Sequence, residues 1–239
     1  MTNIKLYTPR LVSSSKSRCM FIFILLLSFL ILSCTTSNQP LEASNTEADE
    51  TLPYFNTPDW TPEWIEKTDS QYQQIHQIPA FNFKDQEGNM ISNKTVNGKI
   101  YIANFFFTTC RGICPKMTSN MYLLQEAFKL DTSILFLSHS VTPESDSISI
   151  LKKYAIENKV NSKQWHLLTG PKKDIYDLAK KQYFAGDTIG YYQTGNEFLH
   201  TENFILLDQK QRIRGVYNGT LLVEIERIKE DIAILKKED

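Results

Sequence analysis

Two cysteines stand between a long apolar run and a helical pattern, and this junction constrains the fold most. Residues 101–107 are too apolar for a half-exposed strand and predict a buried central strand. The segment after the cysteines repeats apolar residues at helical spacing, on one face: Met117, Met121, Leu124 and Phe128. Cys110 and Cys114 are therefore expected on the loop between a strand and the start of a helix.

The position of this pair at a helix start matters for its chemistry. Pro115 suits a first helical turn, where its missing N–H removes no helical hydrogen bond. A helix N-terminus carries partial positive charge, which favours thiolate over thiol. The C-x-x-x-C spacing lets the two sulfurs of Cys110 and Cys114 either close a disulfide or hold a soft metal ion.

Composition narrows the class of protein. The 239 residues carry a net charge of −1 and are 41% hydrophobic, which is typical of a globular chain. No basic excess or stripe suggests nucleic acid as a partner. There are four cysteines: Cys19, Cys34, Cys110 and Cys114.

The N-terminal region indicates export. A basic start precedes an almost wholly apolar segment, residues 20–32, which is shorter than the roughly 20 residues of a membrane span. The segment ends in Leu30-Ile31-Leu32-Ser33-Cys34 and resembles a bacterial lipoprotein signal, with cleavage before Cys34 and lipid on its thiol. An uncleaved anchor helix is the alternative. Both place the domain outside the cytoplasm, tethered to a membrane.

We divide the chain into three parts: residues 1–33 as a lipoprotein signal peptide, 34–70 as a flexible tether with a short packed segment at 59–65, and 71–239 as the folded domain. Within the domain, strand and helix patterns alternate, and a hairpin and a last helix follow. Strands are expected near 81–83, 90–91, 99–107, 134–138, 165–168, 204–207 and 211–217, and helices after Cys114, near Ile148, after Pro171 and over 222–235. This order predicts an α/β fold with a central mixed sheet flanked by helices.

Over roughly residues 78–237, the sequence resembles the SCO/SenC family of thioredoxin-fold proteins. The segments that carry the resemblance, in family order, are 78–88, 98–115, 136–146, 167–170 and 199–208. Two positions depart from the family pattern. Thr142 replaces the usual first acid of an acidic loop whose second acid is Asp146, and His139 stands where an aliphatic residue is common.

The resemblance implies a thioredoxin-like fold and a copper site, for Cu(I) or Cu(II), formed by Cys110, Cys114 and His200. It implies a metallochaperone of the bacterial cell envelope, facing the periplasm, that helps build the binuclear copper site of cytochrome c oxidase. The implied partner is the copper domain of oxidase subunit II, and a thiol reductase is a further candidate. Some family members instead act as thiol–disulfide oxidoreductases on that site's cysteines.

The residues themselves leave alternatives open. Thiolates are soft ligands that select Cu(I), and an imidazole can complete the set, but two cysteines and one histidine also occur in zinc sites. A structural disulfide is the ordinary interpretation of a cysteine pair in an exported protein. A peroxidase is disfavoured, because Phe107 stands where a peroxiredoxin has threonine. His139 is a candidate auxiliary copper group or a group that contacts the copper ligands. Asp146 is a candidate for the latter role too, although it is expected mainly to shape its loop.

Overall fold

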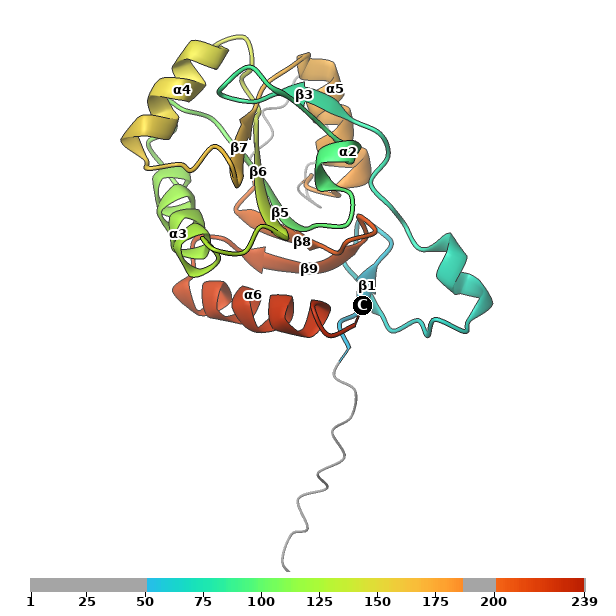
Figure 1. Cartoon of the computed structure of the whole chain (residues 1–239). Helices are drawn as coiled ribbons and strands as arrows, with labels where there is room; N and C mark the ends of the chain where they lie inside the picture. The colour runs from blue at the N-terminus through green and yellow to red at the C-terminus, as the bar shows by residue number, and fades with distance from the viewer. Residues whose placement is uncertain (1–50, 187–200, 239) are drawn as a thin grey trace, which may run out of the picture. The chain divides into compact units, whose positions relative to one another are not determined.

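The computed structural model describes residues 51–186 and 201–238. Its centre is a five-stranded sheet in the order β7-β6-β5-β8-β9 (Figure 1). The strands are β5 (Ile100–Phe106), β6 (Ile134–Ser140), β7 (Trp165–Leu168), β8 (Asn203–Leu207) and β9 (Ile213–Asn218). The expected apolar runs thus form the sheet, with β5 in the middle.

The pairing of β5 sets which loops lie together. It runs parallel to β6, from Ile100 opposite Ile134 to Phe106 opposite Ser140, and β6 runs parallel to β7. On its other side β5 is antiparallel to β8, which is antiparallel to β9. The sheet is therefore mixed, as expected. The ends of β5, β6 and β7 share one edge with the beginning of β8.

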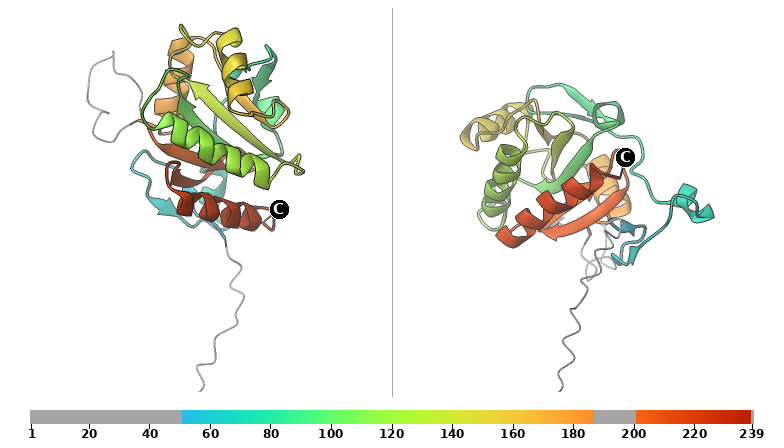
Figure 2. Two further views of the ribbon diagram at one scale, coloured as in Figure 1. Left: turned by 90° about the vertical axis from the view of Figure 1, so that its left-hand side faces the viewer. Right: turned by 60° about the horizontal axis from the view of Figure 1, so that its bottom comes forward.

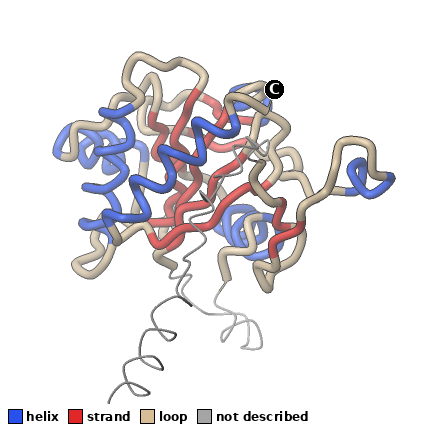
Figure 3. Tube along the Cα trace, turned by 90° about the horizontal axis from the view of Figure 1, so that it is seen from below, coloured by secondary structure: helices blue, strands red, loops and turns tan. Residues whose placement is uncertain are grey.

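Both faces of the sheet are covered (Figure 3). One face carries α3 (Cys114–Ala127), α4 (Ile148–Glu157) and α6 (Leu222–Leu235), of which α3 and α6 are in contact (Figure 2). The other face carries the hairpin of β3 (Asn82–Lys84) and β4 (Met90–Ser92), α2 (Asn93–Val96), α5 (Lys172–Asp177) and the π-helical turn η2 (Leu178–Gln182).

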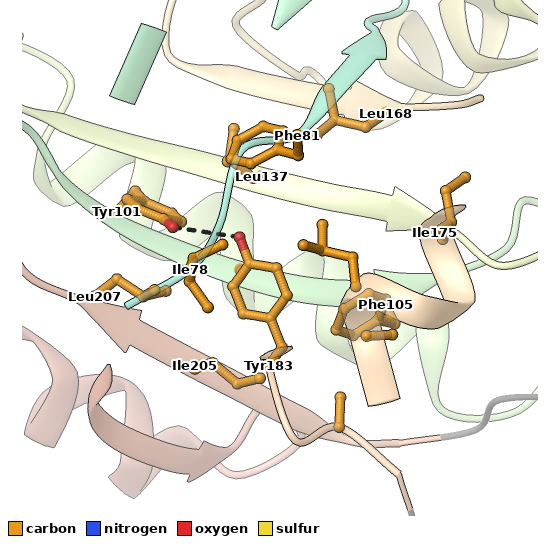
Figure 4. Packing of buried hydrophobic residues seen from close by; sticks show 14 of the residues in the cluster. Ile78, Phe81, Tyr101, Phe105, Leu137, Leu168, Ile175, Tyr183, Ile205 and Leu207 are labelled. Carbon is orange, nitrogen blue, oxygen red and sulfur yellow. Dashed lines mark hydrogen bonds between the residues drawn. The ribbon is translucent and has the colours of Figure 1, made fainter. Parts of the chain in front are cut away.

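Each face has its own apolar core. Under α3, the side chains of Met117, Met121 and Leu124 are buried, so these methionines are core residues, as expected from their spacing. Opposite them, Tyr101 and Tyr183 share a 3.3 Å hydrogen bond between their hydroxyls inside an apolar cluster (Figure 4). The pleat of β5 sends alternate side chains into these two cores.

The segment before β3 packs on the domain. It contains β1 (Tyr54–Phe55), which pairs with β2 (Pro62–Glu63), and the 3₁₀ turn η1 (Ser70–Gln74). Within the expected short packed segment, the Trp60 ring meets that of Phe184 edge to face at 5.9 Å, whereas Trp64 is 65% exposed. Part of the region expected as a tether therefore contacts the folded domain.

In residues 51–186 and 201–238, no helix has both the length and the apolar character needed to cross a bilayer. The expected signal peptide, residues 1–33, and the tether up to residue 50 lie outside the described residues. The same is true of Cys34.

Candidate functional site

The two cysteines lie where β5 gives way to α3. The strand ends at Phe106 and the helix begins at Cys114, so residues 107–113 form a loop at the carboxyl edge of the parallel strands. Ligands of open α/β sheets commonly bind at this edge. Cys110 is half-buried, whereas Cys114 is 4% exposed, and both thiols are free. The structure thus brings the pair together at an accessible edge.

Cys110 lies in a setting that favours its thiolate. Burial acts to raise the pKa of the Cys110 thiol, but the Cys114 thiol donates a hydrogen bond to its sulfur, and so do the backbone N–H groups of Cys114, Gly112 and Ile113. The donors outweigh burial, and the pKa of Cys110 is lowered. These N–H groups lie at the start of α3, where backbone donors lack helical partners.

The surroundings of Cys114 favour the thiol over the thiolate. Burial raises the pKa of Cys114 to about 12, and its hydrogen bond and charge interaction with Cys110 act in the same direction. The pair is therefore asymmetric: the half-buried Cys110 loses its proton more readily than an ordinary thiol, and the buried Cys114 holds its proton. This is the arrangement of a nucleophile and its resolving partner, and both sulfurs become soft donors once deprotonated.

Asp146 joins the cysteine loop to the end of β6. Its carboxylate is fully buried and accepts a hydrogen bond from Thr108 Oγ1 at 2.5 Å and one from Thr108 N at 3.3 Å. It also accepts from Ser140 Oγ at 2.6 Å and Thr142 Oγ1 at 3.0 Å. Asp146 does shape its own loop, but it reaches the cysteine loop as well.

Two residues near the cysteines were missed by sequence reasoning. The Tyr154 hydroxyl and Thr118 Oγ1 are 2.7 Å apart. Burial raises the pKa of Tyr154, the hydrogen bond with Thr118 opposes this, and interactions with Cys114, Cys110 and Asp146 act in the same direction as burial. Thr118 could have been found, because it lies one helical turn after Cys114. Tyr154 comes from α4, and no local sequence signal places it here.

His139 is placed differently from the expectation of an auxiliary copper group. Its fully buried ring stacks on Phe105 at 5.2 Å and meets Phe83 edge to face at 5.9 Å, in the core on the face opposite α3. In β6, residues 135, 137 and 139 point to that face, away from Cys114. We therefore correct the expectation: the strand's alternation makes His139 a core residue.

His200 lies outside the described residues. Within the two described ranges, no three His, Cys, Asp or Glu side chains gather as a metal site. The next residue, Thr201, is buried and precedes β8, whose antiparallel pairing sets Ile205 opposite Ala103 of β5. The beginning of β8 therefore lies at the edge that holds the cysteine loop.

Comparison with known proteins identifies the family. A family model described as SCO1/SenC matches residues 69–236, which is most of the chain. The chain belongs to the SCO1/SenC family. The match includes β3 to β9 and the cysteine loop, and it confirms the resemblance seen in the sequence motifs.

Individual relatives agree with this family assignment. The SCO1 protein homolog of Bacillus subtilis (strain 168) is 29% identical over 159 residues, covering 66% of this chain and 81% of that protein. A solved SCO1/SenC family lipoprotein from Bacillus anthracis str. Ames is 30% identical, with a TM-score of 0.58, covering 67% of this chain and 95% of that one. BsSco, described as a Sco family cytochrome c oxidase assembly protein with a disulfide switch, is 28% identical, with a TM-score of 0.56 and coverages of 67% and 94%.

These neighbours establish that the mixed sheet and its helices form a thioredoxin-like fold. Structures of more distant Sco proteins have been solved with copper bound. One is ScoI of Bradyrhizobium japonicum, at 22% identity and a TM-score of 0.51, covering 66% of this chain and 97% of that one. At this identity the likeness shows the shared fold.

Proposed function

We propose that this protein is a copper metallochaperone that carries copper between Cys110 and Cys114. The observation that carries the proposal is the pair of free thiols at the carboxyl edge of the sheet, one half-exposed and inclined to ionise. Two soft sulfur donors fit Cu(I) better than hard cations. Family membership, with copper-bound relatives, supports copper over zinc.

His200 is the proposed third ligand. It precedes the buried Thr201 at the start of β8, and the pairing of β8 with β5 brings that start to the edge of the cysteine loop. An imidazole nitrogen would complete a set of two sulfurs and one nitrogen. Binding requires deprotonated thiols, so copper affinity should fall as pH falls. A disulfide between the cysteines would release copper, because it offers no thiolate.

The proposed location is the bacterial cell envelope, with the domain facing the periplasm and anchored through lipid on Cys34. The short apolar segment 20–32 that ends near Cys34 supports this, as does the solved family member described as a lipoprotein. A bacterial lipoprotein carries several acyl chains, which makes attachment stable. The Cys34→Ala variant should accumulate as an unprocessed precursor, detected by mass spectrometry of the mature N-terminus.

The proposed partner is the copper domain of cytochrome c oxidase subunit II, in keeping with BsSco's description as an oxidase assembly protein. The test is a transfer assay in which the copper-loaded full chain is mixed with the copper-free subunit II domain. Copper should move to the oxidase domain, and Cys110→Ser or Cys114→Ser should abolish the transfer. Copper that stays on the chaperone when the acceptor is in excess would refute the role.

A second function is favoured by the opposite pKa shifts of the two cysteines. A lowered pKa at Cys110 and a raised one at Cys114 suit a thiol–disulfide oxidoreductase, which could reduce the oxidase site's cysteines. The two functions separate experimentally. The oxidised, copper-free subunit II domain is offered to the reduced protein without copper, and its thiols are counted. Reduction under these conditions, with no transfer in the first assay, favours the oxidoreductase.

A further inference from the structure

The cysteine loop is fixed at one point by a buried carboxylate. Asp146 is fully buried, and its two oxygens receive four hydrogen bonds, two of them from Thr108. Thr108 lies two residues before Cys110. The other two donors, Ser140 and Thr142, belong to the end of β6 and the turn after it.

This arrangement is more than a local turn. Asp146 already closes its own turn through its backbone N–H, which donates to Thr142 O at 2.9 Å. Besides its contacts to Ser140 and Thr142, the side chain crosses to Thr108, 38 positions away in the sequence. Hydrogen bonds to a charged group are stronger than those between neutral groups, so this contact can restrain a loop.

The restrained peptide touches both cysteines. Phe107, directly before Thr108, accepts a hydrogen bond from Cys110 N at 3.3 Å through its carbonyl. Its backbone N–H donates toward the Cys114 sulfur. A shift of Thr108 therefore moves the groups that position Cys110 and Cys114.

We propose that Asp146 is a positioning residue for the dithiol. By holding Thr108, its carboxylate stabilises the loop conformation in which Cys110 and Cys114 are both free thiols, and so favours the reduced pair over the disulfide. The inference rests on the proposed function only in that the pair must be able to cycle between dithiol and disulfide.

The test measures the dithiol's midpoint potential in the full-length chain in detergent. The protein is equilibrated with mixtures of reduced and oxidised dithiothreitol. Closing the disulfide releases two protons and two electrons from the thiols, and oxidised dithiothreitol takes them up. Differential alkylation and mass spectrometry of the peptides containing Cys110 and Cys114 then give the oxidised fraction.

Asp146→Asn should favour the disulfide at least tenfold, which is about 30 mV more negative for a two-electron couple. Thr108→Val, which removes only the hydroxyl donor, should shift the potential in the same direction. Thr108→Ser keeps the hydroxyl and should restore the wild-type midpoint. The matched control is Asp85→Asn, another fully buried carboxylate, which binds Glu87 N and Asn89 N in a turn. It should leave the midpoint unchanged.

The outcomes are distinct. A wild-type midpoint in both Asp146→Asn and Thr108→Val would overturn the inference and leave Asp146 a structural residue. If Asp146→Asn does not fold, Thr108→Val and Thr108→Ser decide the question. If Cys110 and Cys114 of the wild type never form a disulfide, both the proposed dithiol chemistry and the inference about Asp146 are wrong. If the wild-type pair does cycle but the variants have the same midpoint potential, only the inference about Asp146 is wrong.

Discussion

At the scale of single residues, Cys110 and Cys114 should react very differently although they are only four positions apart. The half-buried Cys110 has a lowered pKa, whereas burial raises the pKa of Cys114 to about 12. Since the thiolate is the nucleophile, iodoacetamide should label Cys110 at least tenfold faster at pH 7. Peptide mass spectrometry of the reduced chain follows both sites. Cys114→Ala should slow labelling of Cys110, because the side-chain donor to its sulfur is lost. Equal rates at both cysteines in the wild type would contradict the assignment.

His139 predicts a pH dependence of stability. Burial lowers the pKa of His139 from 6.5 to about 4, and a weak interaction with the Asn104 backbone acts in the opposite direction. Within the described residues, neither ring nitrogen makes a hydrogen bond of normal geometry. The unfolded chain therefore binds the proton more readily, and stability falls as pH drops from about 6.5 towards 4. Between pH 7.5 and 4.5 the loss is about 2.5 kcal/mol.

His139→Leu should remove this part of the acid sensitivity. Urea unfolding of both proteins at the two pH values measures it. The difference between the proteins isolates His139 from His166, whose pKa burial also lowers. An identical loss in both proteins would show that His139 does not titrate on unfolding.

At the scale of elements, the packing of α3 depends on the face of the helix that is turned to the sheet. Leu124 is fully buried and the adjacent Leu123 is 41% exposed, so they form a matched pair on the same helix. Leu124→Ala should lower the free energy of unfolding by about 2–5 kcal/mol through lost burial and a cavity. Leu123→Ala should change it by less than about 1 kcal/mol. Chemical denaturation of both variants is the measurement, and similar losses would mean that the helix packs differently.

The elements also show how far sequence reasoning reaches. Apolar runs and helical spacing predicted β3 to β9, the helices α3 to α6 and the cysteine loop, because local patterns dictate them, but they did not predict β1, β2, η1 or α2. Contacts between distant segments, such as Thr108 with Asp146, leave no local pattern. The alternation of β6 does put His139 on the same face as Leu137. Which face of the sheet α3 covers depends on the crossover from β5 to β6. The expectation for His139 was wrong because the sequence alone does not show that α3 covers the face opposite this side chain.

At the scale of the whole molecule, Arg214 joins the two ends of the described domain. Its buried guanidinium donates to both Glu238 oxygens, at 2.6 and 2.8 Å, and to the carbonyls of Leu52 and Pro53. It also lies 4.1 Å from the centre of the Tyr54 ring. This contact attaches the segment around β1 to β9 and to the residues that follow α6.

Arg214→Ala should destabilise the protein by about 3–5 kcal/mol, because it leaves Glu238 partly buried and unpaired. It should also expose residues 51–55 to limited proteolysis. Arg227 is the control: its side chain is 58% exposed and pairs with Glu224 and Asp231 on α6. Arg227→Ala should cost less than about 1 kcal/mol. Equal thermal unfolding of the two variants would argue against the Arg214 contact.

Copper titration of the full-length protein tests the central claim most directly. Four samples are compared by Cu(I) competition with a chelator, beside thiol counting: reduced wild type, oxidised wild type, His200→Ala and the control His76→Ala. His76 hydrogen-bonds the Gln182 carbonyl through Nε2, away from the cysteines. The account predicts one copper in the reduced wild type and in His76→Ala, none in the oxidised protein, and strongly weakened binding in His200→Ala with an intact disulfide cycle. Equal copper binding by wild type and His200→Ala would contradict the ligand set and favour the oxidoreductase.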